Sequence, residues 1–357
     1  GKGFLQADFL YELGTGSEPK RSFAYLEVPA GEGSYSWNDY NNNNIAELNE
    51  FELSVFTDQA NYIRVFTPTD EFIRSDILTF QYSVALQPKA LFQSKKGLSG
   101  FLNRFSAQSS WQLNRKVLEG AGGVAYTPIG YDYDDKSIDS FRVSNNSLFR
   151  NTIWFDRSKP KFGLTYHLEN TSSLSIIANG PEERLRREHR LETRAALGKL
   201  LNFKGTFSLG RRTLLSDAFV GRDYSLPFIE LSPSLSLQSG TEWRITAGYT
   251  YESLDNDLGV ETLRSHKGSL EGRYSKLSKS TVDVGLSLVL ANFEGQTDSP
   301  VGFAMLEGLQ DGTNLLWNLN YDRRISRNVQ LGFNYEGRKT GTAIPAHIGR
   351  AQLRAIF

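Results

Sequence analysis

Oxygen-bearing side chains recur at short spacing in the segment that begins at Asp39, which reads DYNNNNIAELNE. Counted from Asp39, they fall at positions one, three, five, nine and twelve, and position seven offers its backbone carbonyl. Hard cations such as Ca²⁺ take six to eight oxygen ligands, and a loop of this length ending on a carboxylate supplies them. We therefore predict that a structural Ca²⁺ ion is held by Asp39, Asn41, Asn43, Ile45, Glu47 and Glu50.

This loop resembles the calcium loops of EF-hands and, more closely, those of thrombospondin type 3 repeats, where position seven is aliphatic like Ile45. Position six is Asn44 where Gly is usual, and Asn tolerates the left-handed conformation that the turn needs. Positions three and five depart from the pattern because they are neutral Asn, and no paired second loop follows. The alternative is an ordinary Asn-rich turn. Bound Ca²⁺ would rigidify the segment rather than catalyse a reaction.

Arginine and glutamate alternate at every second position from residue 186 to residue 194. A period of two places all of these side chains on one face of a strand. One interpretation is a paired polar lining, since opposite charges on neighbouring strands attract each other. The other is a constriction that selects substrates. The charged ladder consists of Arg186, Glu188, Arg190, Glu192 and Arg194.

Charge and composition exclude several classes of protein. The chain has 40 basic and 40 acidic residues and a net charge of zero, which argues against a nucleic-acid partner. It has no cysteine, so neither a disulfide framework nor a thiolate metal site can form. Mean hydropathy is −0.40. The chain has no run of 18 apolar residues, which is the length that would predict a transmembrane helix.

Apolar and polar residues alternate through most of the chain from residue 78 onward. Between Val282 and Leu290, for example, every second residue is Val or Leu, with Asp, Gly and Ser among those between. Such a period of two predicts strands. The thirteen predicted strands are 78–87, 101–115, 147–156, 161–169, 185–197, 202–210, 228–237, 242–252, 264–274, 280–291, 313–322, 327–337 and 347–357.

The lengths of these strands suit the roughly 9–11 residues that a tilted strand needs to cross a bilayer. Short connections, such as 198–201, alternate with long ones, such as 116–146 and 292–312, as periplasmic turns alternate with outer loops in bacterial barrels. We predict an all-β fold, an antiparallel transmembrane β-barrel of about 14 strands (range 12–16), which occupies residues 78–357. The charged ladder would then face the lumen.

Strand parity predicts a further strand near the N-terminus. If the C-terminus is periplasmic, strand 78–87 runs inward and an outward strand must precede it. Alternation across residues 4–13 supplies the candidate. Residues 1–77 would then form an N-terminal β segment with the calcium-type loop and this barrel strand. Two alternatives remain open, a larger barrel with further N-terminal strands and a globular β subdomain at 1–70.

The chain's last eleven residues read HIGRAQLRAIF, with Ala351, Leu353, Ala355 and Phe357 on one strand face. This ending resembles the C-terminal signal that the bacterial barrel-assembly machinery recognises. The stretch Tyr11–Pro68, with YELGTG, GEGSYSWNDYNNNN and DQANYIRVFTPT, resembles a region near the C-terminal barrel of large outer-membrane proteins of the Bacteroidota. The resemblance implies a Gram-negative outer membrane, a longer precursor with a periplasmic portion, and membership of envelope assemblies for secretion, uptake or barrel assembly.

The histidines give little support for catalysis. None of His167, His189, His266 and His347 has a partner at the spacing of a metal site. A Ser–His site like that of outer-membrane phospholipases, using His167, is the enzymatic alternative, yet no pattern connects it to a particular Ser. The acidic aromatic cluster Tyr131–Asp135 is interpreted as a solvated loop, with a ligand or cation contact as the alternative. We predict no enzyme.

Two functions fit these features. The first is an outer-membrane barrel that anchors or scaffolds a multiprotein complex, with membrane lipid and envelope proteins as partners and a lumen filled by loops or charge pairs. The second is a diffusion channel or transporter for small solutes, because about fourteen strands leave a pore unless it is plugged. The sequence determines the architecture better than it determines the task.

Overall fold

The computed structural model describes residues 3–91, 96–120, 126–128, 142–177, 180–276, 279–326 and 328–355. The fold is all-β, and a single sheet of sixteen strands contains nearly all of the regular structure. β2 (Tyr35–Trp37) and β3 (Phe51–Leu53) have three residues each, and the other fourteen strands are long. The cluster Tyr131–Asp135 and the terminal Phe357 lie outside the described residues.

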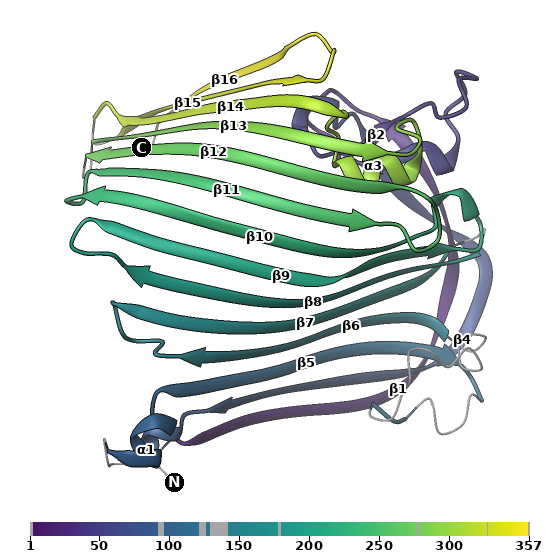
Figure 1. Ribbon diagram of the computed structural model, residues 1–357. Helices are drawn as coiled ribbons and strands as arrows, with labels where there is room; N and C mark the ends of the chain where they lie inside the picture. The colour runs from purple at the N-terminus through teal and green to yellow at the C-terminus, as the bar shows by residue number, and fades with distance from the viewer. Residues whose placement is uncertain are drawn as a thin grey trace.

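The long strands lie side by side in the order of the chain, each antiparallel to the next, and β1 pairs with the outer edge of β4 (Figure 1). They are β1 (Leu5–Glu27), β4 (Tyr62–Leu86), β5 (Phe105–Leu118), β6 (Arg142–Phe155), β7 (Phe162–Ile177), β8 (Gly180–Ala196), β9 (Leu201–Ser216), β10 (Tyr224–Ser239), β11 (Trp243–Asp255), β12 (Thr262–Lys276), β13 (Ser280–Glu294), β14 (Gly312–Arg324), β15 (Val329–Thr340) and β16 (Ala346–Ala355). The helices are short: α1 (Gly97–Leu102), α3 (Pro300–Leu306) and the 3₁₀ turns η1 (Leu48–Glu50), η2 (Thr57–Gln59), η3 (Pro88–Ala90) and η5 (Val220–Arg222).

Each predicted strand overlaps one of the strands β4 to β16, and residues 5–13 lie in β1, where Leu5 pairs with Leu86. Several boundaries differ. β4 begins at Tyr62 rather than at residue 78, β1 continues to Glu27 and β7 to Ile177, and the strand predicted from residue 101 begins at Phe105. The preceding residues form α1, and the ring of Phe101 packs edge-on against Phe105 at 5.2 Å between centroids. The alternation near residue 101 therefore reflects packing of a helical turn rather than strand geometry.

The sheet is strongly curved and remains open, whereas the sequence predicts a closed barrel. Among the described residues β1 and β16 form the two long edges and share no backbone pairing, and the free edge of β1 meets β7 only at Arg21 and Ile177. Alternation determines strands and the pairing of chain neighbours across short turns. Closure joins the first strand to the last, and no local pattern encodes that pairing.

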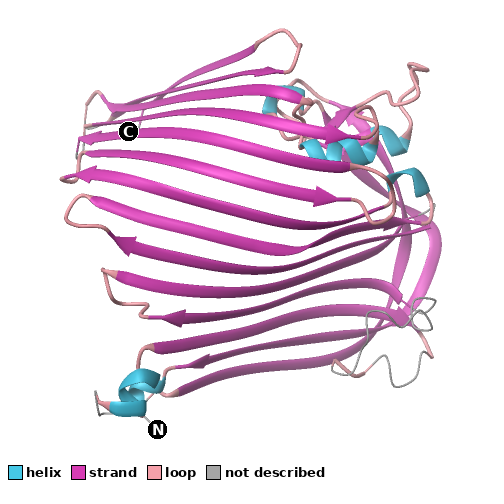
Figure 2. Ribbon diagram, viewed as in Figure 1, coloured by secondary structure: helices cyan, strands magenta, loops and turns pink. Residues whose placement is uncertain are grey.

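The two faces of the sheet differ in polarity. On the convex face, large apolar side chains are exposed at alternate positions, as in β13, where Val284, Leu286, Leu288 and Leu290 are 44–49% exposed. Short turns meet at one end of the sheet, and longer loops and most of the helices meet at the other (Figure 2). We call the latter the loop end.

Helix α3 covers the concave face at the loop end. The Ser299 hydroxyl accepts a hydrogen bond from the Gly302 N–H at 3.0 Å and caps the helix, and Pro300 occupies its first turn. Val301, Met305 and Leu306 pack against an apolar cluster from β10 to β13 that includes Phe228 and Leu254. This cluster is the apolar core within the curve of the sheet.

Candidate functional site

Residues 28–61 connect β1 to β4 and fold over the loop end beside α3 (Figure 1). This segment, which we call the cap, contains β2, β3, η1 and η2. The rings of Tyr25 at the end of β1 and Phe51 in the cap stack at 4.0 Å, and Tyr62 at the start of β4 meets Phe51 edge-on. Aromatic packing therefore secures the base of the cap to the hairpin from which it rises.

Two ion pairs connect the cap to distant parts of the sheet. The Arg222 guanidinium, in η5, donates to Glu52 at 2.8 Å, with only 7% and 12% of the side chains exposed. Arg338 of β15 donates two hydrogen bonds to Asp58, at 2.6 and 2.7 Å, and holds the pKa of that carboxyl below its usual value. The cap thus bridges the concave side of the sheet from the β9–β10 connection to β15.

The calcium-type loop lies in the cap, and its first half has a compact turn geometry. The Asp39 carboxylate accepts hydrogen bonds from the N–H groups of Asn43 and Asn44 at 3.1 and 2.8 Å. Asn44 has φ +58°, the left-handed conformation expected at position six. Asn43 Oδ1 accepts the N–H of Ile45 at 2.6 Å. These bonds bring the side chains of positions one, three and five into one turn.

The second half of the loop is arranged differently. Asn41 donates to Glu47 at 2.7 Å, whereas Glu50 accepts from the indole N–H of Trp37 at 2.9 Å through Oε2. Glu50 is 1% exposed, and its Oε1 has no hydrogen-bond partner. In the part of the chain that the structure describes, no three His, Cys, Asp or Glu side chains form a cluster suited to a metal ion. The three carboxylates of the predicted set, Asp39, Glu47 and Glu50, are therefore not gathered at one point in this structure.

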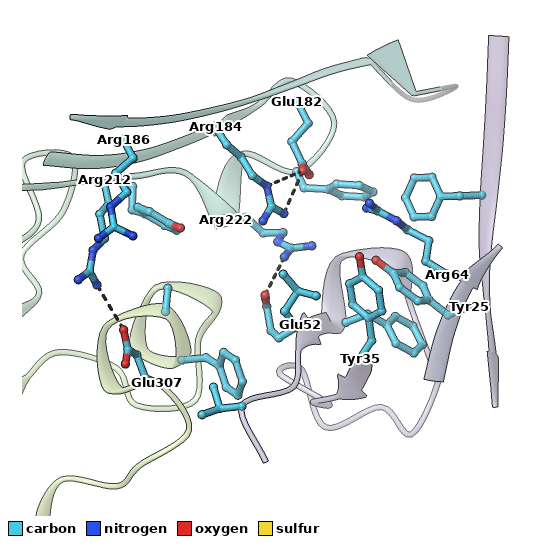
Figure 3. A pocket seen from close by; sticks show the side chains of 18 residues that line it. Tyr25, Tyr35, Glu52, Arg64, Glu182, Arg184, Arg186, Arg212, Arg222 and Glu307 are labelled. Atoms are coloured by element: carbon cyan, nitrogen blue, oxygen red, sulfur yellow. Dashed lines mark hydrogen bonds and ion pairs between the residues drawn. The ribbon is translucent and has the colours of Figure 1, made fainter. Parts of the chain in front are cut away.

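A cavity of about 480 Å³ lies between the cap, α3 and the concave face of β8 to β10. Figure 3 shows its side chains converging from strands β1, β4 and β8 and from the cap. Aromatic rings, including those of Tyr25, Tyr35 and Tyr224, form part of the wall. The charged lining consists of Arg64, Arg184, Arg186, Arg212, Arg222, Glu52, Glu182 and Glu307.

Burial makes Glu52 unusual among the carboxylates of this cavity. Desolvation raises its pKa to about 7, although the neighbouring Arg222 acts in the opposite direction. The Arg222–Glu52 pair is therefore fully charged only above neutral pH. Near neutral pH, the contact between cap and sheet therefore depends on pH through the Glu52 carboxyl.

The charged ladder lies on the concave face of β8, but most of its pairs run along the strand. Glu188, only 4% exposed, accepts hydrogen bonds from both Arg186 and Arg190, each as short as 2.6 Å. One pair crosses to the neighbouring strand, between Glu192 and Lys204 at 3.0 Å. The arrangement supports the interpretation of a paired lining.

The histidines take part in cross-strand pairs. His189, His266 and His347 each contact a tyrosine hydroxyl on the adjacent strand, at 2.7 to 2.8 Å. Their partners are Tyr166, Tyr249 and Tyr335. His167 contacts the Thr152 hydroxyl at 3.2 Å. Each histidine is therefore paired with a hydroxyl group on the adjacent strand of the sheet.

Sequence reasoning missed most of the cavity. Arg184 and Glu182 continue the charged ladder two and four positions upstream of Arg186, so the same period of two could have included them. Arg222 and Arg64 give no such signal, because each is an isolated arginine whose position depends on how distant segments pack. The predicted calcium loop and the cavity adjoin in sequence at Glu50 and Glu52, within the same cap.

No protein-family profile matches the chain. No curated protein matches it either. In the part of the chain that the structure describes, no helix is both long enough and apolar enough to span a membrane.

Solved structures similar to this chain are outer-membrane proteins and porins. A loop L8 deletion mutant of OmpT, an outer membrane protein of Vibrio cholerae, shares 9% identity at a TM-score of 0.40, over 99% of both chains. The outer membrane channel DcaP of Acinetobacter baumannii shares 8% sequence identity at a TM-score of 0.41, over 99% of this chain and 97% of that one. An anion-selective porin from Comamonas acidovorans shares 9% sequence identity at a TM-score of 0.36, over 97% of both chains.

Proposed function

We propose that the protein is an integral β-barrel of a bacterial outer membrane that anchors or scaffolds a multiprotein envelope complex. The observation that carries this proposal is the cap, which is held across the loop end by the Arg222–Glu52 and Arg338–Asp58 pairs. A lumen blocked at one end by the protein's own chain suits an anchor better than a pore for free diffusion. Secretion, uptake and barrel assembly are the processes that such a complex would serve.

The apolar convex face supports the membrane location. Ile229, Leu231, Leu235 and Leu237 of β10 are 43–49% exposed, and β13 shows the same pattern. Exposed apolar residues this numerous and this regular would cost a water-soluble protein its solubility. In a bilayer the same face contacts lipid, and the polar concave face is shielded from it.

In the membrane, the proposal requires the sheet to close by pairing β1 with β16. Unpaired N–H and C=O groups in hydrocarbon cost several kcal/mol each, so an open edge is not tolerated there. The two edge strands run antiparallel, and their outward residues are exposed, Phe9 by 69% and Leu353 by 66%. Fourteen strands are an even number, which lets the last strand meet the first in antiparallel register.

Cysteine cross-linking tests this closure in a chain without natural cysteine. Phe9→Cys is combined in turn with Gly349→Cys, Ala351→Cys and Leu353→Cys, and membranes are treated with a mild oxidant. We expect one combination to form an intramolecular disulfide efficiently, because only paired strands bring Cβ atoms within about 4.5 Å. Phe9→Cys with Ser234→Cys on β10 is the control and should stay reduced. Intermolecular disulfides alone would show that another chain seals the edge.

The scaffold role is tested by purification from native membranes. The tagged protein is extracted in mild detergent, and co-purifying proteins are identified by mass spectrometry with stoichiometry. We expect partners at near-equal molar ratio, and their identities would name the process. A protein that purifies alone, under extraction that keeps other envelope complexes intact, would contradict the scaffold role.

The alternative function, a channel or transporter, is favoured by the polar interior. Arg190 and Arg194 of the charged ladder lie on the concave face, where Arg194 donates to the backbone carbonyl of Lys159 at 3.5 Å. If the cap moves aside in the membrane, these cations would face a water-filled lumen. Conductance that changes on Arg190→Gln or Arg194→Gln would support this function.

Structural Ca²⁺ in the cap is part of the same proposal. The buried Glu50 Oε1 without a partner fits a cation, because a carboxylate oxygen removed from water needs a positive neighbour or a donor. Asp39, Asn41, Asn43 and Glu47 would complete the oxygen set with the Ile45 carbonyl. Ca²⁺ would hold the loop rigid at an exposed position on the outer surface.

Chelation tests the calcium proposal. We expect excess EDTA to lower the melting temperature of the cap, since a ligand at 100 times its Kd contributes about 2.7 kcal/mol. Asp39→Ala should abolish the difference between Ca²⁺ and EDTA, and the exposed Asp298→Ala should keep it. An unchanged melting profile with chelator and with Asp39→Ala would show that the loop is an ordinary Asn-rich turn.

A further inference from the structure

The cavity beneath the cap contains more cationic groups than carboxylates. Five arginines and three glutamates line it. Pairs within the lining join Arg184 to Glu182 at 3.0 Å and Arg212 to Glu307 at 3.3 Å. Arg186 and Arg212 also pair with Glu188 and Glu252, and Arg222 pairs with Glu52.

Arg64 has no carboxylate partner among the described residues. Its guanidinium instead lies over aromatic rings, 4.9 Å from the centroid of Phe66 and 5.4 Å from that of Tyr35. Figure 3 shows it beside Tyr25 and Tyr35 at the side of the cavity opposite Arg184. Stacking on rings fixes the plane of a guanidinium. Arg64 also hydrogen-bonds to the Tyr25 hydroxyl, and a guanidinium has five N–H donors, so others can reach a ligand.

Two further arginines have N–H groups to spare. Arg222 is 6% exposed, and its Nε is buried without a hydrogen-bond partner. Arg212 likewise has a buried Nε without a partner. Buried donors of this kind are destabilising unless they meet an acceptor. These two Nε atoms have almost no accessible surface, so an acceptor in the cavity would meet the terminal N–H groups of Arg222 instead.

The remaining lining is aromatic. Tyr25 packs against Tyr35 at 5.0 Å and stacks on Phe51 at 4.0 Å, which makes a continuous ring surface beside Arg64. A volume of about 480 Å³ lies in the range of small-molecule sites. The cavity therefore combines a cationic side with a flat apolar side.

We propose that this cavity binds a small organic phosphate, with the phosphate group between Arg64 and Arg222 and a ring of the ligand against Tyr25 and Tyr35. Guanidinium groups match phosphate oxygens in bidentate geometry and bind them strongly. A phosphate with three acceptor oxygens can serve several arginines at once, which a carboxylate with two cannot do as well. The proposal goes beyond the anchor role and does not rest on it.

Titration calorimetry on the purified, detergent-solubilised full chain tests the proposal with phenyl phosphate as the probe. We expect saturable binding. Inorganic phosphate should bind at least about fivefold more weakly, because it lacks the ring contact, which contributes about 1 kcal/mol. Benzyl alcohol should not bind. Benzoate that binds more tightly than phenyl phosphate would overturn the assignment of a phosphate ligand.

Variants of Arg64 locate the site. Arg64→Gln should weaken phenyl phosphate binding about tenfold, the equivalent of one charged hydrogen bond, and Arg64→Lys should weaken it less because the charge stays. Arg150→Gln is the matched control, since Arg150 pairs with Glu169 at 2.7 Å outside the cavity. Binding that is absent in the native chain, or equal in Arg64→Gln and Arg150→Gln, would overturn the proposal. Unchanged electrophoretic heat-modifiability confirms that each variant is folded.

Discussion

Under the proposed function, deletion of the cap is expected to convert a barrel whose lumen is blocked into a conducting one. Glu27 at the end of β1 and Tyr62 at the start of β4 are register partners, so an Asn-Gly turn can replace residues 28–61 without disturbing the hairpin. Barrels of 16–18 strands enclose aqueous channels and those of 8 strands do not, so fourteen strands without a cap should conduct about tenfold more than with it. Single-channel recording in planar bilayers measures the change.

The control for this deletion is an Asn-Gly insertion in the short turn between β10 and β11, at Gly240, which leaves the cap in place. It should conduct no more than the native chain. High conductance in the native protein would contradict a closed mouth and favour the channel function. Equal, low conductance with and without the cap would show that α3 and the charged ladder fill the lumen by themselves.

The sequence predicts the strands well because their signal is local. In β13, alternation of Val and Leu with small or polar residues determines both the strand and its apolar outer face. Antiparallel neighbours joined by short turns then follow in chain order. Long connections carry less information, and α3 lies in one of them, since its seven residues are too few to show a helical period.

The candidate site illustrates what remains beyond local patterns. Arg222 meets Glu52 across 170 positions of the chain, and Arg338 meets Asp58 across 280. Neither spacing corresponds to a motif, because both contacts arise from the fold of the cap over the sheet. The calcium-type loop, in contrast, is a contiguous pattern, and its left-handed Asn44 was expected from position alone.

Replacement of Arg222 by Met is expected to weaken attachment of the cap by about 1–3 kcal/mol at pH 8, because it leaves the buried Glu52 without its hydrogen-bond donor. Hydrogen exchange at the amides of Asn38 and Ser54 measures this opening, since their N–H groups bond to Glu50 and Ser34 within the cap. Arg150→Met breaks an exposed ion pair. It should change the free energy of opening, measured at the same amides, by less than about 1 kcal/mol. Equal effects would mean that the Arg222 pair does not hold the cap.

The pH dependence of this effect follows from the raised pKa of Glu52. That pKa is about 7 in the folded protein against an ordinary 4.5, so the folded state holds the proton more tightly. The contribution of Glu52 to the free energy of unfolding is therefore complete below about pH 4.5, and it is lost as the pH rises through 7. Without Arg222 the pKa rises further, since one opposing charge is gone, and the penalty continues to grow above pH 7.

The free energy of cap opening should therefore differ between Arg222→Met and the native chain more at pH 8 than at pH 5. At pH 5, Glu52 is protonated in both proteins. Adding Glu52→Gln removes the buried charge, so the double variant should recover most of the lost stability and show no pH dependence from this site. A double variant as unstable as Arg222→Met would show that the loss comes from packing of the arginine stem. In either case the comparison separates charge from packing in the contact between Arg222 and Glu52 that holds the cap to the sheet.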